Sequence, residues 1–301
     1  MNPTTILVAV LLALVALTTA FPSAAAPAPA TCANKRLRKE IRDLSRAELR
    51  AFQAAMVKLH DNGAIARYTQ LHKKHLTLAH FNPSFLPFHR ISLKGFEEEL
   101  VAASNGVLTG LPYWDSTADA AHPEQSVVLS PAFMGSGNLG QRGCIRDGPF
   151  AGIKRENGTC VERKMQPGPW KSDKDLVDKI NRLHSGDYDR WEYFVERGPH
   201  FVIHSMIGGD MALLPTSSND PIFYVHHAFI DYLWTTFQLK TPAAFTAYNG
   251  TVNGTVYTAN DLVMGYPVKR LFDFQNEPHL CYEYQDAQFP TKGVAALAAY
   301  P

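Results

Sequence analysis

Two histidine-rich segments, far apart in the chain, constrain the fold more than any other feature. They run from His60 to His89 and from His200 to His227, and together they hold nine of the twelve histidines. His200 and His204 are four residues apart, so they project from one face of a helix and their imidazoles can converge on one ion. A fold that joins the two segments would place two groups of imidazoles side by side.

The alternative for any single pair is a buried histidine that is hydrogen-bonded in the core and binds no metal. Two clusters, each able to supply three imidazoles, favour metal binding. No cysteine or acidic residue is interleaved at ligand spacing, which disfavours a structural zinc site of the cysteine type and a carboxylate-bridged dinuclear zinc hydrolase. Imidazole binds zinc, copper, iron and nickel, and copper has the highest affinity of the series. We therefore expect two three-histidine copper sites that face each other and bind oxygen.

The sequence predicts a mainly α fold with a four-helix-bundle core. Ser45 and Glu48 form a capping box ahead of a helix that extends to residue 61. Residues 89–103 keep a helical apolar pattern, and two further apolar segments follow Pro199 and Pro221. Residues 104–185 are rich in Gly, Pro, Ser and Asp, which predicts long loops with short strands.

The charge and composition exclude some classes of function. The chain has 29 Lys and Arg against 28 Asp and Glu, a formal charge of +1, so it lacks the basic surplus typical of nucleic-acid binding. The 46% of apolar residues is enough for a real core. We found no internal repeat, and we expect one folded domain.

The first residues resemble a secretion signal. Residues 6–17 form an apolar run followed by small residues, which is the length of a signal-peptide core and too short to span a bilayer comfortably. The segment before it lacks Lys and Arg, so a buried or interfacial helix is the alternative. We expect a signal peptide over residues 1–20, a Pro/Ala-rich linker or pro-segment over 21–31, and a secreted protein without a stable membrane anchor.

Secretion favours disulfide bonds and glycosylation. The four cysteines allow three pairings. Cys144 with Cys160 closes a short loop, which would leave Cys32 to pair with Cys281. Acceptor sequons for N-glycosylation begin at Asn157, Asn249 and Asn253.

Both histidine segments contain longer motifs. The sequence HFNPSFLPFHR, residues 80–90, resembles the first copper motif of the tyrosinase family of type 3 copper proteins. The sequence DPIFYVHH, residues 220–227, is similar to the second motif of that family. The resemblance extends from Cys32 to the Tyr282-Glu283-Tyr284 element. It implies a copper domain over residues 32–285 and a short tail over 286–301.

The resemblance also implies a ligand set. His72, which follows Arg67-Tyr68 and Leu71, matches the earlier ligand of the first copper better than His75, which remains the alternative. His227 stands where the second motif places its ligand, so we expect His226 to pack behind the site. The predicted ligands are His72, His80 and His89 for the first copper, and His200, His204 and His227 for the second.

Other residues near the motifs have expected structural roles. Asp231, four residues after His227, is expected to orient its helix, and Arg90 and Glu97 to form ion pairs. We expect Phe85 and Phe223 to line the copper pocket. His122, His184 and His279 are expected to play no part in it.

The resemblance implies a reaction in which O2 and two copper ions oxidise phenols and catechols to o-quinones, with no organic cofactor. Family members active on monophenols hold a water between a glutamate upstream of the second copper helix and an asparagine after its first ligand. We expect Glu192 to be that glutamate, with Glu196 as a poorer candidate. The asparagine position holds Phe201, which cannot hydrogen-bond to water. Diphenolase activity is therefore expected to exceed monophenolase activity.

The chain departs from the family pattern at two points. Leu78 and Ala79 precede His80, so no thioether-forming cysteine is expected there. The short tail predicts an open pocket, whose entrance Leu214, Pro215 and Phe201 are expected to shape.

Two other functions are the alternatives to a copper oxidase. One is a hemocyanin-like O2-binding protein, and the other is a secreted structural or binding protein with a degenerate copper site.

Overall fold

The computed structural model describes residues 32 and 34–287, and its core is helical, as the sequence predicts. The expected signal peptide (1–20), the linker (21–31) and residues 288–301 of the expected tail lie outside the described residues. Among the residues that are described, no helix is both long and apolar enough to cross a membrane.

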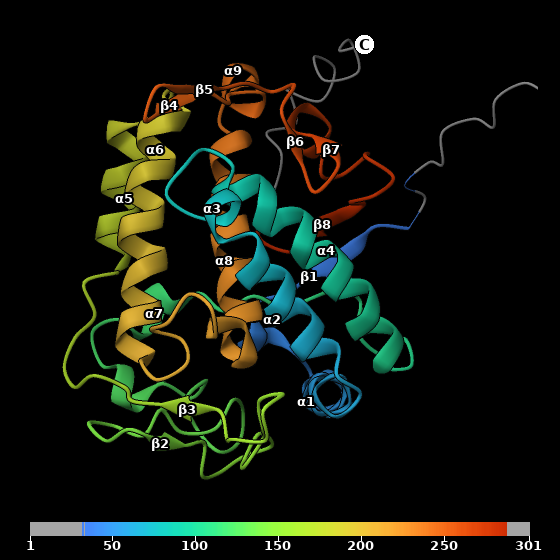
Figure 1. The fold of residues 1–301 in the computed structure, drawn as a ribbon, viewed down its shortest axis with the longest axis vertical. Helices are drawn as coiled ribbons and strands as arrows, with labels where there is room; N and C mark the ends of the chain where they lie inside the picture. Colours follow the sequence, from blue (N-terminus) through green and yellow to red (C-terminus); the bar gives the residue numbers. More distant parts are fainter. Residues whose placement is uncertain (1–31, 33, 288–301) are drawn as a thin grey trace, which may run out of the picture. The chain divides into compact units, whose positions relative to one another are not determined.

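Helix α8, Ile222–Gln238, is the most buried element and lies at the centre of the bundle (Figure 1). Its residues are apolar nearly all round, as expected for a helix with no solvent face. The Asp220 carboxylate accepts the backbone N–H of Ile222 at 2.9 Å. It also forms two hydrogen bonds with the buried guanidinium of Arg163, at 2.7 and 2.8 Å. A segment 57 residues earlier in the chain is thereby attached to the start of α8.

The other bundle helices surround α8 (Figure 1). The helix α4 packs against both α1 and α8. The capping box predicted at Ser45 is present, with Ser45 and Glu48 bonded reciprocally. The helix predicted from His89 begins earlier, at Phe85, because Pro87 fits the first helical turn without losing a hydrogen bond. These helices are α1 (Arg46–Asp61), α2 (Ala64–Lys74), α4 (Phe85–Ala103), α6 (Tyr188–Val195) and α7 (Phe201–Ile207).

A π-helical turn over Glu196–His200 joins α6 to α7. Pro199 lies inside this turn and has no backbone N–H to continue the ordinary helical ladder. The backbone N–H of Phe201 instead bonds to the carbonyl of Glu196, five residues earlier. Such wide turns are rare and are often found at functional sites. Glu196 and His200 are the first and last residues of this wide turn.

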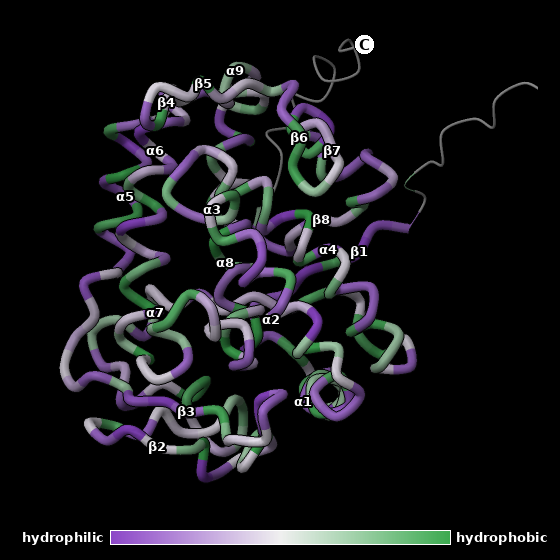
Figure 2. Tube along the Cα trace, viewed as in Figure 1, coloured by the Kyte–Doolittle hydropathy of each residue, from purple (hydrophilic) through white to green (hydrophobic). Residues whose placement is uncertain are grey.

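Residues 104–185 are largely irregular, as predicted, but one helix was missed. The short antiparallel strands β2 (Gly143–Cys144) and β3 (Glu162–Arg163) pair there, and a disulfide joins Cys144 to Cys160. Helix α5, Lys174–Leu183, is capped by Asp173. It carries both hydrophobic and hydrophilic residues (Figure 2), as an amphipathic surface helix does. The remaining short elements are α3 (Leu76–Ala79), α9 (Pro242–Phe245), β4 (Gly250–Val252), β5 (Thr255–Tyr257), β6 (Leu262–Val263) and β7 (Tyr266–Pro267).

The first and last strands of the domain lie together. The strand β1 (Arg36–Arg38) pairs in parallel with β8 (Tyr282–Tyr284). Arg38 bonds to Glu97 on α4 at 2.8 Å and to Asp231 on α8 at 3.0 Å. Asp231 also accepts from Arg90 at 2.6 Å, and from the hydroxyls of both β8 tyrosines. The ion pairs expected for Arg90 and Glu97 are thus present. Arg90 pairs with Asp231, and Glu97 pairs with Arg38.

The cysteine prediction was half right. The Cys144–Cys160 bond is formed, whereas Cys32 and Cys281 are free thiols. These two thiols are in contact, and the Cys32 thiol also points at the carbonyl oxygen of Glu277, 3.6 Å away. Burial, followed by the contact with Cys281, raises the pKa of Cys32 to about 12.

Candidate metal centre

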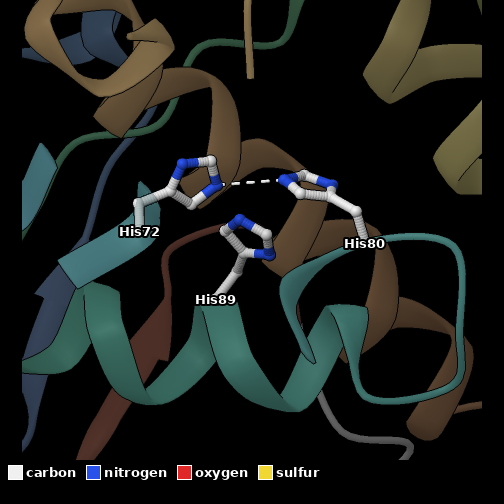
Figure 3. A group of neighbouring side chains, drawn as sticks. All are labelled: His72, His80 and His89. Atoms are coloured by element: carbon white, nitrogen blue, oxygen red, sulfur yellow. Dashed lines mark hydrogen bonds between the residues drawn. The ribbon is translucent and has the colours of Figure 1, made fainter. Parts of the chain in front are cut away.

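Three buried histidines from the first segment converge on one point (Figure 3). His72 lies in the last turn of α2, His80 in the loop after α3, and His89 on α4. Their ligating nitrogens all lie within 4.8 Å of one another, and the Nε2 atoms of His72 and His80 are 2.9 Å apart. His75 lies at the end of α2, outside this group, with its ring centroid 6.2 Å from that of Phe88.

The second segment supplies four buried histidines. Nitrogens of His200, His204 and His226 lie within 4.8 Å of one another. His227 also lies beside this group, because its Nε2 is 3.2 Å from Nε2 of His204. The Nε2–H of His226 is directed at the backbone carbonyl of His200, 3.2 Å away. That nitrogen is therefore occupied by a hydrogen bond, whereas Nε2 of His227 faces another imidazole nitrogen.

Stacked rings connect the two groups. His89 and His227 stack with centroids 4.0 Å apart, and His80 and His200 stack with centroids 5.6 Å apart. As expected, aromatic residues pack against the cluster. Phe85 lies 4.7 Å from the ring of His200, and Phe223 lies 4.2 Å from the ring of His227. Imidazoles from both halves of the chain thus form one cluster, against which aromatic side chains pack.

Backbone carbonyls fix the orientation of several rings. The Nδ1–H of His89 donates to the Phe85 carbonyl at 2.8 Å, and that of His200 donates to the Glu196 carbonyl at 3.0 Å. The Nδ1–H of His204 donates to the Met211 carbonyl at 2.7 Å. In each of these rings Nε2 is then an unprotonated lone pair that points into the cluster. Nε2 of His89 and Nε2 of His200 are buried with no hydrogen-bond partner, which fits a metal ligand.

Comparisons with known proteins agree with this geometry. A family model described as the common central domain of tyrosinase matches residues 52–187 and 177–240. The chain is 31% identical over 303 residues to tyrosinase ustQ of Aspergillus flavus, a match that covers 84% of this chain and 80% of that protein. It is 30% identical over 239 residues to a tyrosinase of Streptomyces antibioticus, covering 69% and 85% respectively. The chain belongs to the tyrosinase family.

Solved structures share the fold of this tyrosinase-family protein. A polyphenol oxidase from Thermothelomyces thermophila, solved as a point mutant, matches with a TM-score of 0.66 at 22% identity, covering 83% of this chain and 88% of that one. A functional unit of octopus hemocyanin matches with a TM-score of 0.58 at 21% identity, covering 87% and 71%. At this identity the likeness concerns the fold.

The two groups of histidines form the dinuclear type 3 copper site of the family. The buried, nitrogen-only donor set suits copper, and neither group contains a thiolate or a carboxylate. Burial lowers the pKa of His72 to about 3 and of His80 and His204 to about 4. Because all three imidazoles are neutral at pH 7, their lone pairs are available to a metal. Copper, O2 and phenolic substrates are the cofactor and reactants of this family.

The structure distinguishes the two glutamates considered from the sequence. The Glu196 carboxylate lies 3.2 Å from Nδ1 of His80 and accepts the backbone N–H of Phe81 at 2.8 Å. Glu192 is buried behind it and hydrogen-bonds to Glu196, and its Oε1 has no other partner. Burial, reinforced by the charge of Glu196, raises the pKa of Glu192 well above its usual range. Glu196, the candidate ranked second, is therefore the one in contact with the metal centre.

The residues expected at the pocket entrance differ in exposure. Phe201, next to His200, is 45% exposed, and Leu214 is half-buried beside His72. Pro215 is exposed. His60 lies outside both groups, 3.2 Å from the carbonyl of Asn219. As expected, His122, His184 and His279 also lie outside them.

Proposed function

We propose that this protein is a secreted copper oxidase that converts catechols to o-quinones and acts on monophenols far more slowly. The single observation that carries the proposal is the convergence of two groups of buried, neutral imidazoles in a chain of the tyrosinase family. A signal-like sequence at the start of the chain supports secretion. The ligands we propose are His72, His80, His89, His200, His204 and His227.

The choice of His227 over His226 rests on the hydrogen bonds. His226 uses Nε2 to hold the backbone carbonyl of His200, which supports the turn that carries that ligand. Nε2 of His227 lies inside the cluster, 3.2 Å from Nε2 of His204, and its ring stacks on His89 of the other triad. A metal ligand needs a lone pair that points at the metal. A histidine that only supports a ligand needs a ring held in place by a hydrogen bond. We therefore assign ligation to His227 and support of the ligand helix to His226.

When bound, the copper pair supplies the redox chemistry that links O2 to the phenol. The overall reaction removes two electrons and two protons from each catechol, so two catechols reduce one O2 to two waters. The protein holds the imidazoles in place through Glu196 and the backbone carbonyls, and it excludes bulk water with Phe85 and Phe223. These aromatic walls also favour the ring of a phenolic substrate.

Monophenols need an additional proton acceptor, and three features of the site disfavour one. Phe201 offers no hydrogen bond to a water beside His200. Burial holds the pKa of Glu192 well above its usual range, which disfavours the charged form that would act as a base. The oxygens of Glu196 already receive the Phe81 N–H and face His80. Catechols bring two acidic hydroxyls of their own and need less help from the protein.

Oxygen uptake by the copper-loaded protein tests this proposal. We expect rapid uptake with 4-methylcatechol, with two quinones formed per O2, and a rate with tyramine at least about 100-fold lower, the lower end of a general-base contribution. Equal rates with both substrates would overturn the diphenolase preference. Reversible oxygen binding without quinone would indicate an oxygen carrier. Bound copper with neither response would indicate a degenerate site.

A further inference from the structure

An arginine lies on an exposed pair of aromatic rings beside the metal centre. The guanidinium carbon of Arg197 is 3.9 Å from the centroid of the Tyr193 ring and 5.4 Å from that of Phe81. The Tyr193 ring is 48% exposed and the Phe81 ring 47% exposed. Stacking of this kind holds the planar cation in place while its edge stays open to solvent. We call Phe81, Tyr193 and Arg197 the aromatic platform.

Arg197 forms an ion pair with Glu196 but donates no hydrogen bond to any acceptor among the described residues. Its nearest carboxylate oxygen, Oε2 of Glu196, is 3.7 Å away, beyond hydrogen-bond distance. Within the described residues, Arg197 makes no hydrogen bond to any protein acceptor, although its side chain is only 40% exposed. By contrast, Arg155 binds Asp210 at 2.6 and 2.7 Å. A positioned guanidinium that donates no hydrogen bond of this kind is a ready site for a carboxylate.

The platform adjoins both metal-binding triads. Arg197 lies three residues before His200, in the π-helical turn, and Phe81 directly follows His80. Phe81 has a φ of 61°, a left-handed conformation that is rare for a large side chain. The Glu196 carboxylate, which accepts the Phe81 N–H, holds this conformation. Strain maintained in this way is concentrated at functional sites, and here it keeps the ring on the surface, under Arg197.

We propose that the aromatic platform is a subsite for the side chain of the substrate and that Arg197 makes the enzyme prefer catechols bearing a carboxylate. The catechol ring would enter toward the histidines, past Phe201, while its acidic tail lies along Phe81 and reaches the guanidinium. Tyr193 fixes the plane of Arg197. This inference rests on the proposed function, and it names the substrate class as phenolic acids, in preference to neutral or cationic phenols.

The size of the preference follows from the exposure of the pair. A partly exposed ion pair contributes up to about 1 kcal/mol, which is about fivefold in binding. Its Coulomb part weakens with salt, because charges at the surface are screened within roughly 10 Å at 0.1 M ionic strength. The effect belongs in KM, since Arg197 binds the tail and does not touch the reacting oxygens.

The test compares 3,4-dihydroxyphenylpropanoic acid with 4-methylcatechol and dopamine, using copper-loaded wild type, Arg197→Gln and Arg197→Lys. Arg190→Gln is the matched control, because Arg190 is also exposed, lies on α6 and has only a 3.8 Å contact with Asp187. We expect Arg197→Gln to raise the ratio of KM for the acid to KM for 4-methylcatechol about fivefold. Arg197→Lys restores part of it, since lysine keeps the charge but not the planar fork. Arg190→Gln leaves the ratio unchanged.

A binding measurement separates this inference from the proposed function. Calorimetry with 3-phenylpropanoate and 3-phenylpropanol, which are not oxidised, needs no turnover. If no catechol is oxidised, the proposed function fails, and loss of a wild-type preference for the phenylpropanoate in Arg197→Gln still supports the subsite. If Arg197→Gln changes KM for acid and neutral catechols equally, or changes neither KM nor the binding preference, the subsite is wrong.

Discussion

The carboxylate of Glu196 lies 3.2 Å from Nδ1 of His80 and fixes the one ligand of the first triad that is carried by a loop. The other two ligands of that triad lie on α2 and α4, where the helix backbone holds them. The same carboxylate accepts the N–H of Phe81. A residue of the second copper segment thereby determines the geometry of the first copper site, so the two sites are structurally dependent on each other.

Replacing Glu196 by Gln is expected to weaken copper binding at the first triad by about 10- to 100-fold, the range for outer partners of metal ligands. The neutral amide no longer supports the positive charge that develops on His80 when it binds a metal. Copper content after dialysis against graded chelator measures the effect. Glu192→Gln is the control, because a buried carboxyl group kept neutral tolerates a neutral isostere. Equal copper loss in both variants would contradict the role of Glu196.

The adjacent histidines His226 and His227 are expected to behave differently. His227→Gln removes a ligand and leaves one firmly bound copper per chain. His226→Gln removes only the hydrogen bond to the His200 carbonyl and keeps two, with a loss of stability of about 1 kcal/mol. Atomic absorption gives the stoichiometry, and urea unfolding gives the stability. Two coppers in His227→Gln and one in His226→Gln would reverse the assignment.

Phe201→Asn is expected to raise the ratio of monophenol to diphenol turnover at least about tenfold, because an amide at this position can hold a water that accepts the phenolic proton. Phe201 is 45% exposed, so the substitution changes stability little. Oxygen uptake with tyramine and 4-methylcatechol gives the ratio. Phe194→Asn, at a similarly exposed ring that follows no histidine ligand, serves as the control. An unchanged ratio in Phe201→Asn would show that another residue controls proton removal.

Asp231 is the buried carboxylate that Arg38 and Arg90 share. Asp231→Asn leaves Arg38 and Arg90 without their shared buried carboxylate, and breaking such a pair costs about 3–5 kcal/mol. Urea unfolding of the copper-free protein measures this loss. Glu99→Gln breaks only the exposed pair with Arg67 and should cost less than about 1 kcal/mol. Similar losses in the two variants would mean that the buried network contributes little.

Acid is expected to destabilise the copper-free protein. In the unfolded chain an imidazole binds a proton near pH 6.5, whereas burial holds the pKa of His72 at about 3 and of His80 and His204 at about 4. Between these values the unfolded state binds more protons, so the free energy of unfolding falls as the pH drops from about 6.5 to about 4. Above about pH 7.5 these histidines are neutral in both states and contribute no pH dependence.

Buried carboxyl groups act in the opposite direction over part of this range. Burial raises the pKa of Glu40 and of Glu196 to about 7, so these groups bind protons in the folded state first and add stability as the pH falls from 7 to about 4.5. The histidines with lowered pKa outnumber these carboxyl groups. The free energy of unfolding should therefore fall overall as the pH drops. Urea unfolding at pH 7.5 and 5.0 decides the sign. Greater stability at pH 5.0 would mean that the carboxyl groups dominate.

Much of the site could be predicted because each histidine segment carries its own local signal. His200 and His204 have helical spacing, and the two motifs contain His80, His89 and the His226–His227 pair, all of which the structure brings into the two groups. The contact between Glu196 and His80 could not be predicted, since ordinary helical spacing does not anticipate a π-helical turn at Pro199. That turn changes which side chain faces His80, and it depends on packing that the local sequence does not encode.

Long-range pairings were harder to predict than local ones. Nothing near Arg163 indicates that it will bind Asp220, and the free thiols of Cys32 and Cys281 were expected to be bonded. Helix α5 was missed because the Gly- and Pro-rich composition around it outweighed its own signals. Its capping residue, Asp173, and the amphipathic sequence that follows were sufficient to find it.

The most direct test of the central claim is a crystal structure of the copper-loaded protein with anomalous data collected on both sides of the copper edge. The account predicts two copper peaks per chain. One should be bound by Nε2 of His72, His80 and His89, and the other by Nε2 of His200, His204 and His227, with His226 unligated. A single peak, a different metal, or ligation by His226 in place of His227 would contradict it.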